Sequence, residues 1–200
     1  MNHSIRPQLV IPVAIVLTVV TLVVAFVGSP DSNEPDIKTA EPTILRGEGQ
    51  ESAARLDAWT RPVSTDPRVV AIAYGRAIWT YDTAKHGLDD WQNAVSVFAD
   101  PMGEGPRIAR SLLPHFREWQ QLELRKARAT ADDITAEVTP AMKRLQDSAA
   151  APKGWTGFVV QGKQTTVIDN EHVVTDRRAA VGVVCTSICK FWSASPQIEP

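Results

Sequence analysis

The feature that most constrains this chain is an unbroken apolar run near its N-terminus, residues 9–27, with the sequence LVIPVAIVLTVVTLVVAFV. It contains no charged side chain. A helix of this length rises about 28 Å, which matches the hydrocarbon core of a bilayer. Valine and isoleucine favour strands in water, but a lone segment in lipid must satisfy its own backbone hydrogen bonds. The run therefore predicts one transmembrane helix.

Two alternatives compete with this interpretation. A buried helix of a globular domain is rarely apolar on every face over such a length. A cleaved signal peptide usually has a shorter apolar core, of about 7 to 15 residues, and small residues at its cleavage site. Here the run is longer, and Pro30 lies beside the poor site formed by residues 27–29. An uncleaved anchor fits the sequence better.

The charges beside the run predict its orientation. Arg6 precedes it, whereas Asp31, Glu34 and Asp36 follow it. Basic residues near a span stay on the cytoplasmic side, and acidic residues carry little weight. We therefore expect a cytoplasmic tail at residues 1–8, with the rest of the chain on the outer side of the cell membrane.

The overall composition limits the kinds of partner that we expect and the number of domains that the chain can form. The formal net charge is −2 and the isoelectric point is near 6.1, so we expect no specific nucleic-acid partner. Six tryptophans indicate a substantial core, because each can bury a large apolar area. The chain beyond the anchor is long enough for a single domain.

Residues 28–63 have the composition of a flexible linker. Four prolines lie among acidic and hydroxyl side chains, and no apolar period is sustained. Within this segment, residues 51–59 can form a short helix with Leu56 and Trp59 on one face. That helix would rest either on the folded domain or on the membrane surface. The folded domain is expected to occupy residues 64–200.

The domain is expected to open with an amphipathic helix. Asp66 suits the N-cap and Pro67 the first helical position. Apolar and aromatic residues then recur at helical spacing as far as Tyr81, and residues 86–87, His-Gly, are expected to end the helix. The stripe consists of Val70, Ala73, Tyr74, Ala77, Ile78 and Tyr81.

Two further helical regions are expected. Asp89 can cap the second, with Gln92 completing a capping box. The third opens at Pro106 and is kinked or split at Pro114, because proline lacks the backbone donor of a helix interior. The apolar positions of these regions are Trp91, Ala94, Val95, Phe98, Phe116, Trp119 and Leu122.

Beyond residue 127 the pattern changes from helical to strand-like. Alternating or β-branched segments occur at residues 134–139, 157–160, 164–168, 172–175 and 179–185. Turns are expected at residues 150–154, 161–163, 169–170 and 176–178, although some of these are bends within longer strands in an alternative interpretation. Helices followed by an antiparallel meander indicate an α+β domain, with about three helices on one face of a sheet of about four strands.

The only cysteines, Cys185 and Cys189, form a possible disulfide. In a regular strand, positions four residues apart lie about 13 Å apart, too far for a bond. Pairing therefore requires a bulge, turn or helical turn at residues 186–187, and both the oxidised and the reduced state stay open. A zinc site is not expected, because two cysteines without a following histidine supply too few ligands.

A short pattern in the helical half resembles a known family. Residues 77–83, Ala-Ile-Trp-Thr-Tyr-Asp-Thr, are followed by Trp91, Phe98 and then Ser-Leu-Leu-Pro at residues 111–114. With the order anchor, linker, helices, strands, this pattern resembles membrane-anchored, cone-shaped domains of actinobacteria that are similar to nuclear transport factor two. The resemblance covers residues 64 to about 193, omits the two cysteines, and implies a cone-like fold with a curved sheet.

Two groups of proteins share this layout. One is the bitopic scaffold component of type IV secretion and conjugation machines, and the other comprises proteins associated with Mce lipid-import systems. The resemblance implies a single-pass, non-catalytic scaffold that contacts the bilayer through residues 9–27 and other envelope proteins through its domain, with a possible homo-oligomer. We favour conjugation or type IV secretion over lipid import.

Cones of this kind can also hold enzymes, which need an acid or base inside an apolar pocket. The available groups each have a simpler structural interpretation, as turn, packing or solvent-exposed residues: Asp82, Tyr74, Tyr81, His115 and His172. No phosphate-binding loop, metal-ligand spacing or nucleophile elbow is present. No enzyme, catalytic residue, cofactor or metal is therefore expected.

A small-ligand-binding or isomerase-like cone is the alternative of a different class. Its possible pocket lining consists of Tyr74, Ile78, Tyr81, Trp91, Phe98 and Trp119. An interior filled by aromatic side chains favours the assembly role; the residues concerned are Trp79, Trp91, Phe98 and Trp119. An open pocket with a convergent acid or base favours a catalytic role. The basic residues Arg125, Lys126 and Arg128 are expected to form a solvated helix end and not a lipid or nucleic-acid site.

Overall fold

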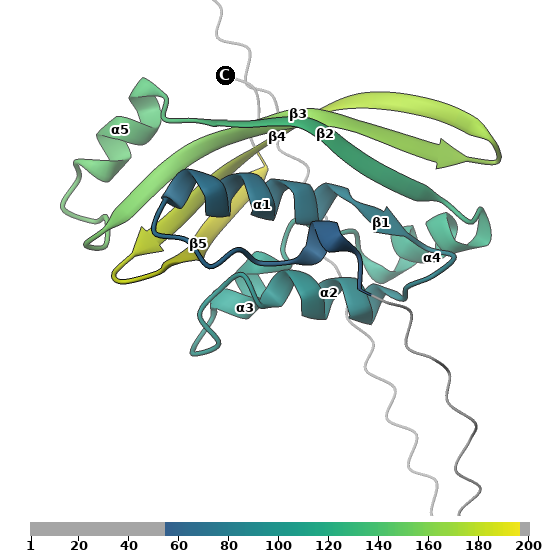
Figure 1. Ribbon diagram of the computed structural model, residues 1–200, viewed down its shortest axis with the longest axis horizontal. Coiled ribbons are helices and arrows are strands. Elements are labelled where there is room, and N and C mark those ends of the chain that lie inside the picture. The colour runs from purple at the N-terminus through teal and green to yellow at the C-terminus, as the bar shows by residue number, and fades with distance from the viewer. Residues whose placement is uncertain (1–54, 197–200) are drawn as a thin grey trace, which may run out of the picture. The chain divides into compact units, whose positions relative to one another are not determined.

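The structure is a computed structural model that describes residues 55–196 (Figure 1). The expected cytoplasmic tail at residues 1–8, the expected transmembrane helix at residues 9–27 and most of the expected linker lie outside the described residues. Among residues 55–196, no helix combines the length and the apolar character needed to cross a membrane.

The described chain is α+β, as predicted, with more elements than the three helices and four strands expected. A curved antiparallel sheet, in the order β1-β2-β3-β4-β5, arches over α1 to α4, while α5 packs at one end of β3 (Figure 1). The elements are η1 (Asp57–Trp59), α1 (Pro67–Trp79), β1 (Tyr81–Asp82), α2 (Leu88–Ser96), α3 (Gly105–Ala109), α4 (Phe116–Leu124), β2 (Arg128–Glu137), α5 (Pro140–Gln146), β3 (Trp155–Ile168), β4 (Glu171–Cys185) and β5 (Cys189–Pro196).

The start of α1 was predicted correctly, but its end was not. The Asp66 side chain accepts a hydrogen bond from the Arg68 backbone N–H at 2.8 Å, and Pro67 occupies the first turn. The helix ends at Trp79 because the next residues join the sheet, with Tyr81 opposite Ala129 of β2. Tyr81 is buried in this strand. Its burial therefore comes from contacts within the folded domain and not from a continuation of α1.

The second helical region differs from prediction in its cap, whereas the third is split as predicted. The N-cap of α2 is Gly87 and not Asp89, because the Asp90 carboxylate accepts the Gly87 backbone N–H at 3.0 Å. Gln92 takes no part in this cap. Pro114 separates α3 from α4, which confirms the predicted split.

The longest strands, β3 and β4, form one uninterrupted hairpin. Their pairing runs from Trp155 opposite Val184 to Ile168 opposite Glu171, so residues 161–163 and 176–178 are not turns. The alternative of longer strands is therefore correct. The only reversal between β3 and β4 is at Asp169 and Asn170, whose positive φ angles of 50° and 69° suit a two-residue hairpin turn.

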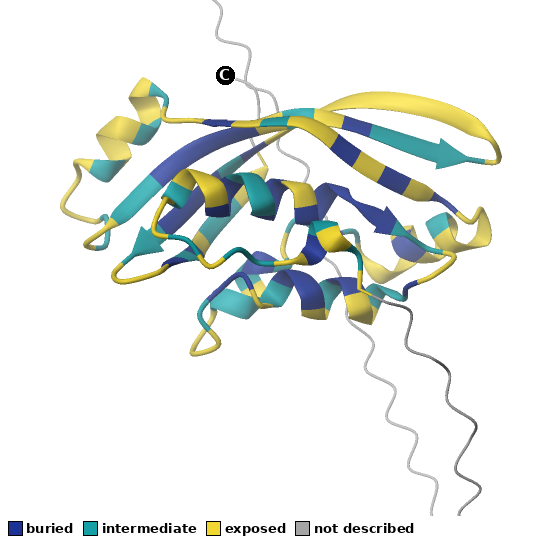
Figure 2. Cartoon of the chain, in the orientation of Figure 1, coloured by how far each residue is buried: buried dark blue, intermediate teal, exposed yellow. Residues whose placement is uncertain are grey.

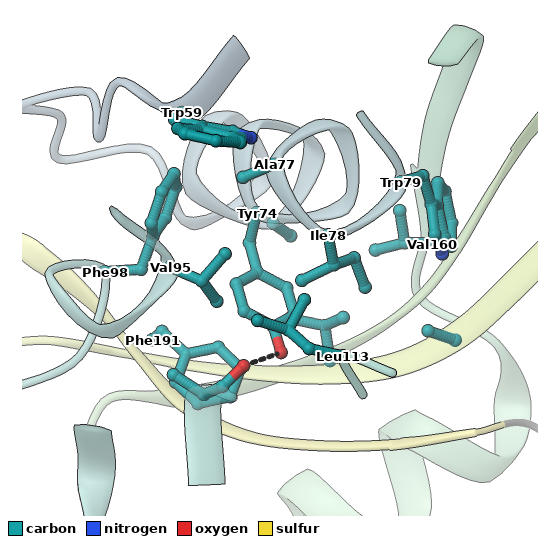
Figure 3. Close-up of a cluster of buried hydrophobic side chains, with 14 of the residues drawn as sticks. Trp59, Tyr74, Ala77, Ile78, Trp79, Val95, Phe98, Leu113, Val160 and Phe191 are labelled. Atoms are coloured by element: carbon teal, nitrogen blue, oxygen red, sulfur yellow. Dashed lines mark hydrogen bonds between the residues drawn. The ribbon is translucent and has the colours of Figure 1, made fainter. Parts of the chain in front are cut away.

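The core lies between α1 and the concave face of the sheet (Figures 2 and 3). Gly75 allows the close approach of α1, because a β-carbon there would lie 2.7 Å from Val160 of β3. Tyr74 lies 4.3 Å from the Phe191 ring, measured between centroids. A second aromatic group, Tyr81, Trp91 and Trp119, stacks pairwise at centroid distances of 5.2 to 5.9 Å.

The segment before α1 belongs to the folded domain. Trp59 of η1 is 1% exposed, its indole N–H donates to the Thr80 carbonyl at 2.8 Å, and its ring lies 4.8 Å from that of His86. Of the two positions considered for residues 51–59, the described part of this segment therefore rests on the domain. The domain thus begins before residue 64, its expected start, and His86 packs in the core instead of capping α1.

Candidate functional site

A cavity of about 710 Å³ opens between the end of α1, the α3–α4 connection, α4 and the concave face of β3 and β4. We call it the α1–α4 cavity. Its lining consists of Ile78, Trp79, Tyr81, Trp91, Leu112, Leu113, Pro114, His115, Glu118, Gln121, Leu122, Gln164 and Arg177. Its volume lies within the range of about 300 to 1,000 Å³ that is usual for small-molecule sites.

Eight of the thirteen lining residues are apolar or aromatic, although polar and apolar atoms contribute about equally to the cavity surface, and Tyr81 adds a neutral hydroxyl. Burial raises the pKa of the Tyr81 phenol, while a hydrogen bond from Thr166 and the positive charge of Arg177 oppose that rise. The net direction is upward, so the phenol keeps its proton at physiological pH. Tyr81 therefore offers a donor and not a base.

The sheet side of the cavity contains one buried polar side chain, Gln164, which is 3% exposed. Its amide nitrogen donates to the Trp79 carbonyl at 2.6 Å, and its amide oxygen accepts from Nε of Arg177 at 2.7 Å. These two bonds offset the cost of burying an amide. They also connect the last carbonyl of α1 to a guanidinium on β4.

The helix side of the cavity contains His115 and Glu118. The Glu118 carboxylate accepts the His115 backbone N–H at 2.8 Å and thereby caps α4. Both side chains are exposed at the rim. Among the described residues, neither makes a side-chain hydrogen bond to Tyr81, Gln164 or Arg177, so no acid–base pair is assembled here.

The structure divides the six residues that were predicted to line a pocket. Ile78, Tyr81 and Trp91 line the α1–α4 cavity. The other three, Tyr74, Phe98 and Trp119, are at most 1% exposed and form packed core. Figure 3 shows Tyr74 and Phe98 among the buried side chains. Trp79, Trp91, Phe98 and Trp119 are all buried, so much of the interior is filled, yet a cavity persists beside it.

Tyr74 is the most deeply buried of the candidate acids and bases. Its hydroxyl donates to the Ala109 carbonyl at 2.8 Å, and burial raises its pKa far above the ordinary range (Figure 3). A phenol that is held neutral and paired with a backbone carbonyl serves packing. Tyr74 therefore fits the structural interpretation that its place on the α1 stripe suggested.

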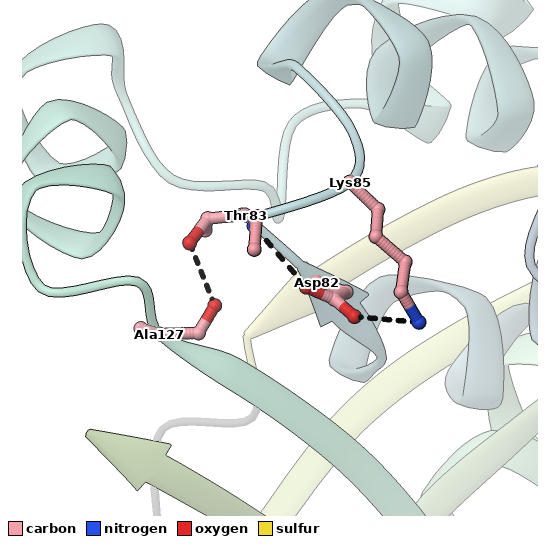
Figure 4. A network of polar contacts seen from close by, with 5 residues as sticks. Asp82, Thr83, Lys85 and Ala127 are labelled. Atoms are coloured by element: carbon pink, nitrogen blue, oxygen red, sulfur yellow. Dashed lines mark hydrogen bonds and ion pairs between the residues drawn. The ribbon is translucent and has the colours of Figure 1, made fainter. Parts of the chain in front are cut away.

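The remaining candidates do not converge on the cavity. Asp82 accepts the Ala84 backbone N–H at 3.1 Å and pairs with Lys85 at 3.2 Å, which makes it a turn residue (Figure 4). The neighbouring Thr83 hydroxyl donates to the Ala127 carbonyl at 2.8 Å. His172 is exposed on β4 and is not among the residues that line the cavity.

The basic residues Arg125, Lys126 and Arg128 line a separate cavity of about 440 Å³. Lys85, Asp82 and Asp169 line it too, and Arg125 pairs with Asp169 at 2.8 Å. Arg125 and Lys85 are thus each compensated by a carboxylate, which fits the expected solvated surface.

Cys185 and Cys189 are joined by a disulfide across the β4–β5 turn, with their Cα atoms 4.0 Å apart. A turn at residues 186–188 supplies the reversal that the spacing required. Beyond it lies an exposed apolar surface, which we call the Trp192 surface and define by Leu145, Trp155 and Trp192. The three side chains border a groove of about 230 Å³, and Trp192 is 50% exposed.

Two features of the cavity were not predicted, namely Gln164 and Arg177. A signal for Gln164 was present, since it shares the inward alternation of Val160 on β3. Residues 55–196 contain no group of three or more His, Cys, Asp or Glu side chains placed to share a metal ion. Comparisons with protein-family models, curated proteins and solved structures give no match to this chain.

Proposed function

We propose that this chain is a non-catalytic, single-pass membrane protein whose folded domain acts outside the cell membrane as an assembly component of an envelope transport machine. Conjugation or type IV secretion is the first choice, and an accessory role in Mce lipid import is the alternative within the same class. In this proposal residues 9–27 form the transmembrane anchor, and the domain is a cone similar to nuclear transport factor two.

The observation that carries the assembly role is the Trp192 surface. Trp192 leaves half of its side chain exposed on β5, the last strand of the sheet, beside the half-exposed Leu145 of α5. Tryptophan is enriched at the centres of protein interfaces, where it supplies much of the binding energy. An exposed tryptophan beside an apolar groove suits a protein partner from the same envelope complex.

The disulfide supports the outer location. Disulfides persist in oxidising compartments outside the cytoplasm and are rare within it. The two cysteines of this chain are bonded to each other. A domain carried outward by an N-terminal anchor would reach such a compartment, so the bond and the apolar run support the same topology.

The topology is tested by cysteine labelling of the full chain in intact cells. In a Cys185→Ser, Cys189→Ser background, Ser32→Cys should react with a membrane-impermeant maleimide. Ser4→Cys, in the expected cytoplasmic tail, is the matched control and should react only after permeabilisation. Labelling of residue 4 but not of residue 32 in intact cells would reverse the orientation and remove the domain from the outer side.

The assembly role is tested in a deletion strain complemented with variants. Trp192→Ala should lower the frequency of conjugative transfer roughly tenfold or more, as expected for loss of an interface tryptophan. Phe116→Ala removes another exposed aromatic, 63% exposed on α4, and should leave transfer unchanged. Normal transfer with reduced uptake of labelled lipid would instead support the Mce alternative, and no effect on either process would contradict the assembly role.

A ligand-binding role is the second candidate, favoured by the α1–α4 cavity. Its volume of about 710 Å³ suits a small molecule, and it lies beside the packed aromatic core.

A further inference from the structure

We infer that the α1–α4 cavity binds an organic anion with an apolar body, whose carboxylate or phosphate group lies against Arg177. This inference deepens the ligand-binding role and is independent of the assembly role. It depends on four features of the cavity: an apolar wall, an uncompensated cation, a buried residue that orients this cation, and a scarcity of competing negative charge.

The apolar wall accounts for the body of the ligand. Ile78, Trp79 and Trp91 contribute it from α1 and α2, and Leu112 and Leu122 from the chain around α4. Aliphatic and aromatic surface of this kind gains from contact with an apolar group, because that contact removes both from water.

Arg177 accounts for the anionic group. A guanidinium has five N–H donors, and within residues 55–196 the structure pairs only its Nε, with Gln164. Arg177 is exposed, and no carboxylate of the described chain lies within ion-pair distance of it. The edge formed by its two Nη groups remains free among the described residues, and a carboxylate or a phosphate can accept a pair of hydrogen bonds from it.

Gln164 accounts for the placement of Arg177. A 3%-exposed glutamine costs free energy to bury unless both ends of its amide are paired. Here one end is anchored on the Trp79 carbonyl and the other holds Nε of Arg177. The pair of bonds fixes the guanidinium at the cavity wall, so Gln164 is a positioning residue.

The remaining charges leave room for an anion. Glu118 is the one carboxylate among the residues that line the cavity, and its oxygen is engaged by the backbone of His115. The adjacent Asp176 and Arg178 lie on the opposite face of β4, because side chains alternate along a strand. They line a different cavity of about 490 Å³, which Arg177 also borders and where Asp133 and Lys163 supply both signs of charge.

The test uses the full chain in lipid nanodiscs, labelled with 5-fluorotryptophan and observed by fluorine NMR. The chain has six tryptophans, of which Trp79 and Trp91 line the α1–α4 cavity, whereas Trp155 and Trp192 border the distant groove. Octanoate, octyl phosphate and the neutral octanamide are titrated. Saturable shifts of Trp79 and Trp91, without shifts of Trp155 and Trp192, are expected for at least one of the two anions.

Matched variants then isolate the charge. Arg177→Gln should weaken binding of the preferred anion at least roughly tenfold, the size expected for a lost charge-assisted hydrogen bond. Arg178→Gln, one residue along on the other face, should leave it unchanged. Arg177→Lys keeps the charge without the fork and should restore part of the affinity, which separates loss of charge from loss of fold.

The two anions also distinguish the sources of the ligand. Tighter binding of octanoate indicates a carboxylate such as a free fatty acid, and tighter binding of octyl phosphate indicates a lipid phosphate. The inference is overturned if neither anion gives saturable shifts, if octanamide binds as tightly as both anions, or if the two arginine variants weaken binding equally.

Discussion

The β3–β4 hairpin has two halves that pair alike and are buried very differently (Figure 2). In the near half, residues 155–161 and 178–185, the inward side chains of Phe158 and Val181 are at most 2% exposed. In the far half, residues 162–177, Val173 is 51% exposed and Gln164 is the one buried side chain. The hydrogen-bonded ladder is continuous across both.

The difference shows that helix coverage, and not strand pairing, decides where the stability of this sheet resides. The near half is covered on its concave face by α1, which packs on β3 and β4 through Tyr74, Gly75 and Ile78. The far half extends past the end of α1, and the α1–α4 cavity occupies part of its concave face. Gln164 lies at the border between the packed core and the α1–α4 cavity.

The strongest test of this comparison truncates one apolar residue in each half. Phe158→Ala should lower the free energy of unfolding by about 3 to 5 kcal/mol, because it leaves a cavity in packed core. Val173→Ala should change it by less than about 0.5 kcal/mol, since Val173 is half exposed. Urea unfolding followed by tryptophan fluorescence measures both. A large cost for Val173→Ala would mean that a partner or second copy covers the far half.

The next largest effect on the free energy of unfolding is expected at Gln164, the residue at the border between the two halves. Gln164→Leu leaves the Trp79 carbonyl without its partner and should cost about 1 to 3 kcal/mol, even though leucine is the more apolar side chain. Gln161→Leu is the control, because Gln161 is exposed on the opposite face of β3, and should cost less than about 0.5 kcal/mol. If Gln164→Leu were as stable as the parent or more stable, the hydrogen bond from Gln164 to the Trp79 carbonyl would contribute nothing to stability.

The sequence predicted those parts of the fold that have local signals. Asp66 with Pro67 marked the start of α1, and Pro114 marked the break before α4, because caps and prolines act through their own backbone. α5 was missed although Thr139 caps it and Pro140 follows, as at α1. Its residues include none that is buried, so no apolar stripe drew attention to it.

The elements that depend on distant partners were less predictable. Tyr81 fits the helical stripe of α1 equally well, and only its pairing with Ala129 places it in a strand. β5 was missed because the adjacent Phe191 and Trp192 break the alternation of a strand. Both placements are set by tertiary contact, which a local pattern does not contain.

The cavity was half predictable for the same reason. Ile78, Tyr81 and Trp91 were identified from helical spacing and line it. The local pattern predicts a turn at residues 176–178 and so does not place Arg177 on the concave face. The strand pattern at residues 164–168 does not predict the burial of Gln164, because that burial depends on the α1 carbonyl that its amide reaches.

The two halves should also differ in how their stability depends on pH, because Tyr74 packs over the near half and Tyr81 over the far half. A raised folded-state pKa gives stability that is present below the unfolded value near 10 and lost as the pH rises further. Burial raises the pKa of Tyr74 in the near half without opposition, whereas Arg177 and Thr166 limit the rise at Tyr81. Tyr74→Phe should cost about 1 kcal/mol at pH 7 and flatten the alkaline loss of stability more than Tyr81→Phe does. Urea unfolding between pH 7 and pH 11 measures this, and equal flattening would contradict it.

The smallest effect concerns the contact that joins β5 to the loop after α2. Lys190 lies 2.7 Å from Asp100, and this hydrogen bond, with a second from the Met102 backbone, lowers the pKa of the Asp100 carboxyl. A lowered folded-state pKa gives stability that is present above the unfolded value near 3.9 and lost as the pH falls through the folded one. Asp100→Asn should therefore be slightly less stable than the parent at pH 6 and equal to it at pH 2, with the difference reduced by salt because both groups are exposed. Thermal unfolding across this range measures the difference. A gap that persists unchanged at pH 2 would show that Asp100 acts through the shape of its turn and not through its charge.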